Sequence, residues 1–292
     1  MKRKALITAT AVLLVAVMCL ATASYAWFTA GSASAVATLN LNVSAGDTGL
    51  SIATANAKAG TYTPGVFKTT TLTETDLTNN GYYAKQLQPV STTGVFATAD
   101  GKTTLPFYEA PVTSYDDESG EWSVKAADND EYVLFSFYVK NSDANDNSTY
   151  AVKFESTALF GSSDFNSTVK MAYNVKKVDL DTNKDVTPTI PDALTIKAAK
   201  GCTDATPYYP VTSAPQGGYI TRNTTSGEFE GSAGVLSTTQ IADETFTDPT
   251  FKFEGEGAYL VTVAIWLEGQ DKNCTGSLNV TAADMTVTLA TA

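Results

Sequence analysis

Apolar and polar residues alternate with a period of two along much of this 292-residue chain. The clearest example is the segment 39–44, in which Leu39, Leu41 and Val43 share one face and polar residues occupy the other. Because successive side chains of a β-strand point to opposite faces of the sheet, this alternation indicates a strand with one buried face. Helical periodicity is rare, and the 14 tyrosines and 13 phenylalanines favour pleated sheet. The pattern therefore predicts an all-β fold.

Two segments, 131–140 and 258–267, are apolar on both faces of the expected strand. A strand of this kind is covered on both sides, so these two segments are predicted to lie at the centre of the fold. In the first segment, one face carries Val133, Phe135, Phe137 and Val139, and the other face carries Tyr132, Leu134 and Tyr138. In the second segment, one face carries Tyr259, Val261, Val263, Ile265 and Leu267, and the other face carries Leu260 and Trp266.

One-sided alternation predicts further strands at 150–154, 169–175, 194–196 and 285–289. After 169–175 the apolar positions change from odd to even across Lys176 and Lys177, which predicts a β-bulge there.

No stretch has the composition of an interdomain linker, and turns are rich in Asn, Asp, Gly and Pro. The strands are therefore predicted to form one antiparallel β-sandwich domain with long loops over residues 46–292. Residues 56–120 are the least patterned part of it and are treated as an insertion, in which a short helix at Glu74–Leu87 fits the sequence.

The N-terminus has the order of a secretory signal peptide: Lys2, Arg3 and Lys4, then an uncharged apolar run over 5–23, then small residues. Cut sites of the small-x-small type follow Ala23, Ala26 and Ala35. An uncleaved anchor is the alternative, because the apolar run lies at the lower edge of spanning length. No later segment is apolar enough to span a membrane, so the chain is expected to be exported and to lack a membrane segment after cleavage.

Charge and composition exclude several functions. The chain has 31 acidic and 19 basic residues, a net charge of −12, and loss of the leader would make it three units more negative. Without a basic cluster after residue 4, binding to nucleic acid is not expected. The chain has no histidine, which removes the Ser-His-Asp triad, the Cys-His dyad and histidine-ligated zinc. The chain is therefore predicted not to be an enzyme, although paired carboxylates from distant strands would leave no local signature.

Two cysteines, Cys202 and Cys274, remain once Cys19 departs with the leader. In an exported chain they can form a disulfide that closes a loop of about 70 residues, worth roughly 3–4 kcal/mol in the chain-entropy model. Two independent thiols are the alternative.

Two acid-rich turns offer alternating oxygen ligands of the kind that calcium loops use: Asp143, Asn145 and Asn147 in the first, Asp181 and Asp185 in the second. Neither continues into an EF-hand pattern, because the glycine is missing and the downstream glutamate is misplaced. Solvated turns are the alternative interpretation, and no other cofactor is predicted.

A few other residues have the chemistry of binding sites. Trp122 and Trp266 are candidate platforms for sugar rings, although Trp266 lies in a predicted central strand, where core packing is the better interpretation. The acidic run 116–118 is interpreted as a charged loop.

The leader and the strands together resemble a known family. The residues Ser24-Tyr25-Ala26-Trp27-Phe28-Thr29, the alternation from Leu39 to Val43, the strand Phe135–Asn141 and the segment Ile265–Asp271 followed by Cys274 carry the resemblance. They are similar to the TasA/camelysin family of biofilm-matrix proteins, which Firmicutes export through a SipW-type signal peptidase, and to its members from Clostridia. The likeness covers about a third of the chain.

The resemblance implies a jelly-roll-like sandwich, cleavage between Ala26 and Trp27, and polymerisation in which an N-terminal strand pairs with a neighbouring subunit. Transferred to this chain, that donor strand lies within 27–45 and presents Leu39, Leu41 and Val43. The alternative is that this strand closes its own sandwich. Some relatives are described as metallopeptidases, but this chain has neither the HExxH motif nor any histidine.

The sequence thus predicts an exported structural protein of the extracellular matrix or cell surface, a subunit of a fibre assembled by strand addition. Its expected partners are further copies of itself, other matrix or surface components and the signal peptidase. A monomeric secreted module that binds carbohydrate or a surface partner is the alternative.

Overall fold

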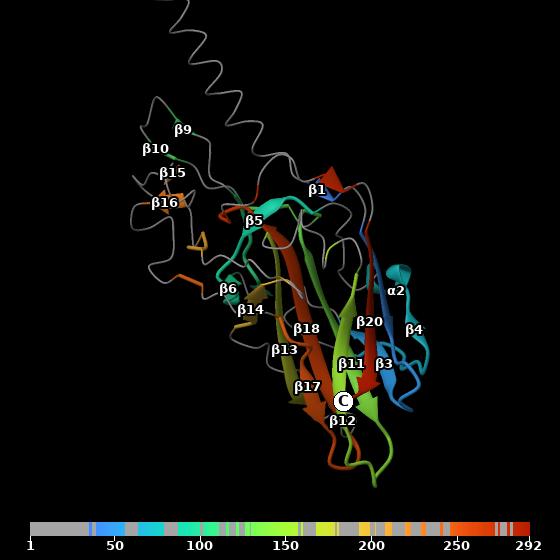
Figure 1. The fold of residues 1–292 in the computed structure, drawn as a ribbon. Coiled ribbons are helices and arrows are strands. Elements are labelled where there is room, and N and C mark those ends of the chain that lie inside the picture. The colour runs from blue at the N-terminus through green and yellow to red at the C-terminus, as the bar shows by residue number, and fades with distance from the viewer. Residues whose placement is uncertain are drawn as a thin grey trace, which may run out of the picture.

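The structure, a computed structural model, describes one continuous body of β-strands together with several short segments (Figure 1). The described residues are 35–36, 39–55, 64–78, 87–99, 102–110, 115–116, 121–122, 126–128, 130–156, 159, 168–178, 180, 193–198, 202, 208–211, 220–222, 229–231, 240–241, 246–271, 274, 279–280 and 283–292. The predicted leader and the cleavage position at Ala26 and Trp27 lie outside them.

The larger sheet contains the two predicted central strands side by side. Its order is β14-β13-β18-β11-β3, and β5 pairs with the end of β18 and with β8. The bounds are β3 Ser51–Ala55, β5 Pro89–Ser91, β8 Tyr108–Glu109, β11 Val133–Asn141, β13 Val169–Val178, β14 Thr195–Ala198 and β18 Gly257–Glu268. The β5·β18 pair is parallel and the other pairs are antiparallel.

The second sheet has five strands in the order β17-β12-β20-β2-β4. The bounds are β2 Leu39–Ser44, β4 Thr71–Leu72, β12 Thr149–Glu155, β17 Thr250–Lys252 and β20 Ala283–Thr291. Its pairs are antiparallel except for β2·β20, which is parallel.

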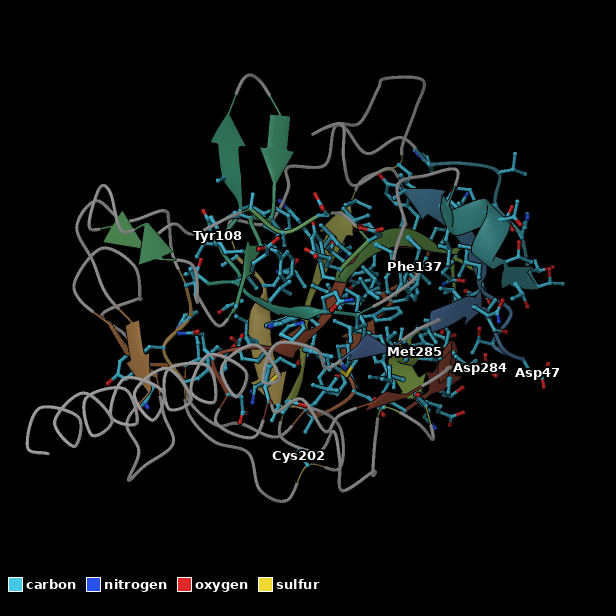
Figure 2. All side chains as sticks on the ribbon, turned by 90° about the horizontal axis from the view of Figure 1, so that it is seen from above. Asp47, Tyr108, Phe137, Cys202, Asp284 and Met285 are labelled. Atoms are coloured by element: carbon cyan, nitrogen blue, oxygen red, sulfur yellow. The ribbon has the colours of Figure 1, made fainter. Side chains whose placement is uncertain are left out.

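The two sheets share one apolar core. Phe137 and Val263 from the larger sheet and Phe154 and Val287 from the smaller sheet are all fully buried in the same cluster. Phe137 lies in the middle of the packed side chains in Figure 2, whereas Asp47 lies at the periphery. The all-β prediction is confirmed.

The outer faces of β11 and β18 are covered as well. Tyr138 and Leu260 pack in a second cluster beside β3, and Trp266 packs with Phe107, their ring centroids 5.5 Å apart, in a third cluster under the segment around β8. The prediction that both strands are central is therefore confirmed, and Trp266, fully buried, is a core residue rather than a sugar platform.

The predicted β-bulge at Lys176 and Lys177 is wrong. Strand β13 pairs with β18 in one unbroken register from Val169↔Leu267 to Val178↔Ala258. The change of apolar positions has another cause: Val178 packs on the outer face of the sheet with the second cluster, whereas the odd positions before it face the shared core.

The helix expected in the insertion is present at its start, as α2 Glu74–Thr78. The remaining short strands are β1 Ala35–Val36, β6 Ala97–Ala99, β7 Lys102–Thr104, β9 Tyr115–Asp116, β10 Glu121–Trp122, β15 Ile220–Arg222, β16 Phe229–Gly231 and β19 Asn279–Val280. Among the helices described, none is long and apolar enough to cross a membrane.

Candidate functional site

The N-terminal strand lies alongside the last strand of the chain. β1 pairs with β19 from Ala35↔Asn279, and β2 pairs with β20 from Leu39↔Ala283, in both cases in parallel. The difference in residue number is the same in the two pairs, although β1 and β19 form a two-stranded sheet of their own. We call this pairing the N-terminal seam.

The inward-facing side chains of β20, one strand of the seam, pack into the apolar core. Met285, Val287 and Leu289 alternate with more exposed neighbours and are at most 1% exposed, while Asp284 is exposed. Figure 2 shows Met285 and Asp284 side by side on this strand. On the N-terminal strand, Val43 is fully buried in the same core. The side chains of Leu39 and Leu41 lie outside the description, although their backbones take part in the pairing.

On its other side, the N-terminal strand is paired over only a short length of the described chain. Strand β4 pairs with Val43 and Ser44, and the amide of Ala45 donates to Thr70 O at 2.8 Å. The predicted donor strand thus lies in this chain's own sheet, between the terminal strand and a two-residue partner.

A short loop, residues 45–50, leads from the seam to β3 in the other sheet. Gly46 and Gly49 have φ values of 60° and 76°, which favour glycine, and Thr48 Oγ1 donates to Ala45 O at 2.7 Å. A Cβ at Gly46 would overlap the carbonyl oxygen of Leu289 in β20, whereas a Cβ at Gly49 would meet nothing. We call this loop the hinge.

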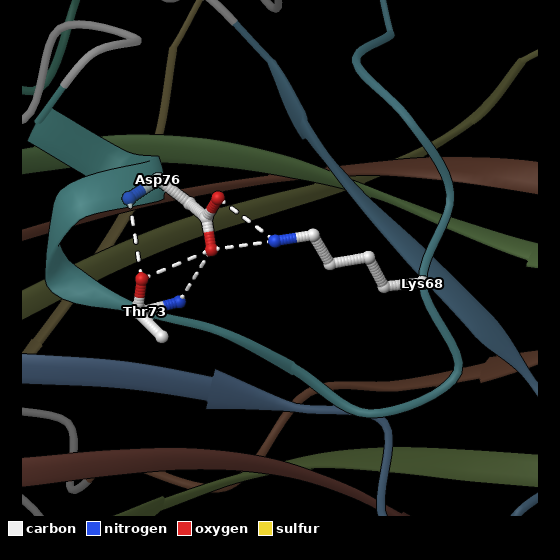
Figure 3. A network of polar contacts seen from close by, with 3 residues as sticks. All are labelled: Lys68, Thr73 and Asp76. Carbon is white, nitrogen blue, oxygen red and sulfur yellow. Dashed lines mark hydrogen bonds and ion pairs between the residues drawn. The ribbon is translucent and has the colours of Figure 1, made fainter.

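A polar network beside the hinge ties the edges of both sheets together (Figure 3). Lys68, whose backbone bridges to Ile52 of β3, places Nζ 2.8 Å from both carboxyl oxygens of Asp76 in α2. Thr73 caps that helix: its Oγ1 lies 3.0 Å from Asp76 Oδ2 and accepts from Asp76 N at 3.4 Å. Hydrogen bonds from Lys68 first, and then from Thr73, lower the pKa of Asp76.

The described calcium candidates belong to a turn between β11 and β12. Asp143 Oδ1 accepts from the amide of Asn145 at 2.9 Å, and Asn147 is exposed. Asp146 accepts from Ser148 N and from the Tyr150 hydroxyl, both at 2.8 Å. Hydrogen bonds from the Ser148 side chain first, and then from the Tyr150 hydroxyl, lower the pKa of Asp146. The carboxylates thus cap the turn's own donors, as in Asx turns. No metal-ligating cluster occurs among the described residues, and Asp181 and Asp185 lie outside them.

Cys202 and Cys274 are both buried, at 6% and 5% exposure, and the disulfide between them stays a prediction. The side chains of Trp122 and of residues 116–118 lie outside the description.

Sequence reasoning missed a group of buried charges at the end of β18. Lys170, Glu268 and Asp271 are at most 2% exposed, and Lys170 Nζ lies 3.0 Å from Asp271 Oδ2. In the sequence, Lys170 occupies an ordinary polar position of an alternating strand, and Glu268 and Asp271 follow a strand end. Their burial depends on the segments that cover the sheet, so no local signal indicates it.

Comparison of the chain with protein-family models, with curated proteins and with solved structures gives no match. The functional assignment therefore rests on the geometry of the seam and the hinge and on the chemistry of the chain.

Proposed function

We propose that this protein is an exported structural protein, the subunit of an extracellular fibre or matrix. In the assembled state, residues 35–44 of one copy occupy the seam of the next copy, against its residues 279–288. The observation that carries this proposal is the parallel pairing of β2 with β20 in an otherwise antiparallel sheet, together with the parallel pair β1·β19, which has the same residue offset.

The position of the strand in the chain supports exchange between molecules. It precedes the rest of the described fold, and the hinge links it to β3. Outside the seam its backbone makes only the short pairing with β4 and the Ala45–Thr70 hydrogen bond among the described residues, so exchange requires these to open as well. The groove it would vacate is lined by Met285, Val287 and Leu289, and an open strand edge over apolar side chains is a template for an incoming strand. An identical strand from another copy makes the same contacts.

The hinge supports the same conclusion. Short loops between a terminal element and the body of a domain permit exchange between identical chains. The hinge holds two glycines in the left-handed region, and a side chain at Gly46 would overlap Leu289 O while the hinge is closed. Glycine adopts extended as well as left-handed backbone, so the hinge can straighten without a side chain in the way.

Charge gives the assembly a dependence on salt. The chain carries −12 overall, and removal of the predicted leader makes it more negative. Like charge keeps exported copies apart, and salt screens the repulsion within about 8–10 Å at 0.1–0.15 M ionic strength. Membership of the TasA/camelysin family, a jelly-roll connectivity of the sandwich and cleavage of the leader after Ala26 are parts of the same proposal.

Paired cysteines placed across the seam test the proposal. Asn42 faces Thr286 in the β2·β20 register, so the variant Asn42→Cys/Thr286→Cys reports whether the strand lies in its own sheet or in another copy's sheet. The matched control is Ala151→Cys/Ala290→Cys in the same sheet, because β12 and β20 belong to one copy in either arrangement.

We expect fibres by electron microscopy, with 42–286 cross-links between chains and 151–290 cross-links within chains, identified by peptide mass spectrometry. Fibres whose 42–286 cross-links all lie within chains would refute strand exchange. Mature protein that stays monomeric across salt concentrations would refute the fibre function itself.

A further inference from the structure

The buried charges at the end of β18 form a compact group, which we call the Lys–Asp–Glu cluster: Lys170 at 2% exposure, Asp271 at 1% and Glu268 at 0%. Lys170 is in β13, directly opposite Trp266 of β18. Glu268 is the last residue of β18, and Asp271 lies in the turn that follows. The cluster therefore joins two adjacent central strands of the larger sheet.

The reacting groups are held in contact. Lys170 Nζ lies 3.0 Å from Asp271 Oδ2. The turn fixes Asp271, because its amide donates to Glu268 O at 3.1 Å and its carbonyl accepts from Cys274 N at 2.9 Å. The ring of Tyr208 covers the ammonium group, with Nζ 5.2 Å from the ring centroid. The amine and the carboxyl that would react are therefore held within hydrogen-bond distance of each other by the fold.

Glu268 is buried near the pair, since the charge of Lys170 acts on the pKa of its carboxyl. Its Oε2 accepts from Trp266 Nε1 at 2.9 Å and its Oε1 accepts from Gln270 N at 3.0 Å, while Ser91 provides a further hydrogen bond. Burial raises the pKa of Glu268 to about 7, against the smaller opposing effects of its hydrogen bonds and of the Lys170 charge. Burial, with the charges of Glu268 and Asp271, raises the pKa of Tyr208 well above its usual value, so the phenol stays neutral.

We propose that Lys170 and Asp271 condense into an intramolecular isopeptide bond, with Glu268 as the proton-transfer group. A proton passes from the ammonium of Lys170 to the carboxylate of Asp271, which leaves a neutral amine and a neutral acid. Nζ then attacks Cγ, a C–N bond forms and a C–O bond breaks. Glu268 gives its proton to the departing hydroxyl and takes one from the nitrogen, so the products are one amide and one water and Glu268 returns to its starting form.

Burial of the two charged groups favours the amide over the ion pair. Two charges removed from water carry a desolvation cost that their attraction does not always repay. The amide is neutral, and the released water can leave for solvent. The fold also holds the two groups together, which removes most of the entropic cost of bringing them into contact. The bond would tie residues 101 positions apart in the chain, and it does not depend on the proposed assembly.

The mass of the intact, unfolded protein tests the proposal. After reduction and alkylation, which remove any contribution from a disulfide, we expect the protein to be lighter than its sequence by the mass of one water molecule. Trypsin should fail to cut after Lys170, and tandem mass spectrometry should find the peptides of Lys170 and Asp271 joined. The full sequence mass, with separate peptides and normal cleavage after Lys170, would overturn the proposal in favour of a permanent ion pair.

Three variants sharpen the test. Asp271→Asn should lose ammonia in place of water and give the same joined peptides, because the amide formed is identical. Lys170→Arg keeps a positive charge but should have the full mass, whereas a succinimide formed by Asp271 alone would persist in it. Glu268→Gln should fold, as judged by circular dichroism, and yet remain unbonded. Rapid bonding in folded Glu268→Gln would overturn the role of Glu268. Whether the isopeptide bond exists is decided by the joined peptide in the unaltered protein, even if a variant does not fold.

Discussion

Replacement of Gly46 by alanine probes the hinge directly. Gly46 has a φ of 60°, and a methyl group there would overlap the carbonyl oxygen of Leu289, which belongs to a β20 residue paired with Val152 of β12. Gly49, three residues further on, has a φ of 76° but open space around it. Gly49→Ala is therefore a matched control that has the backbone strain without the overlap.

The expected magnitudes follow from these two differences. A non-glycine residue in the left-handed region costs about 1–2 kcal/mol, and both variants have this cost. Overpacking that forces a backbone shift adds about 1–3 kcal/mol, and only Gly46→Ala has it because the carbonyl of Leu289 belongs to a hydrogen-bonded strand. Gly46→Ala should thus destabilise the closed monomer by about 2–5 kcal/mol and Gly49→Ala by about 1–2 kcal/mol.

Two measurements check this prediction. Denaturant unfolding of the monomeric proteins gives the free energy of unfolding for each variant, and sedimentation at matched concentrations gives the fraction assembled. Because the overlap exists only while the hinge is closed, Gly46→Ala should also assemble at a lower concentration than Gly49→Ala. Equal free energies of unfolding would refute the close approach at Leu289, and equal assembly would refute the hinge as the point of exchange.

Two further perturbations test other parts of the structure. The folded-state pKa of Glu268 is raised from 4.5 to about 7, so its contribution to stability is present below pH 4.5 and is lost as the pH rises through 7. As the pH rises from 4.5 to 8, the free energy of unfolding should thus fall by about 3 kcal/mol more in the unaltered protein than in Glu268→Gln. An equal dependence of the free energy of unfolding on pH in the two proteins would contradict this. Thr73→Ala removes the helix cap beside Lys68 and Asp76 and should cost about 1 kcal/mol, measured by thermal unfolding. The exposed Thr75→Ala in the same helix is the control, and an equal loss there would show that the cap contributes nothing.

Local pattern was sufficient for the longer strands and insufficient for their partners. The double-faced apolar runs around Phe137 and Val263 identified the two central strands, because a strand covered on both sides has to be apolar on both sides. The same reasoning misplaced Val178: a change in the apolar positions was interpreted as a bulge, although the strand continues regularly and that residue packs on the opposite face. Which face of a strand is covered depends on the elements that pack over it, and these come from distant parts of the chain.

For the candidate sites too, the sequence predicted the segments, whereas their contacts depended on the tertiary structure. The alternation of Leu39, Leu41 and Val43 predicted a pairing strand, but its parallel partner 283–288 lies at the other end of the chain, and no short-range signal links the two. The acid-rich turn at Asp143 was visible in the sequence, whereas its hydrogen bonds to Asn145 and the neighbouring bonds of Asp146 emerge only from the backbone path.

The sequence by itself determined the all-β class, the central strands, the acidic charge and the lack of imidazole chemistry, because these depend on residue type and on side-chain alternation within a few positions. Only the tertiary structure decided that Lys170, Glu268 and Asp271 meet in a buried cluster and that the two ends of the chain share one seam. Burial and long-range pairing are set by what lies across the sheet, and a polar residue in a strand looks the same in the sequence whether water or a buried carboxylate faces it.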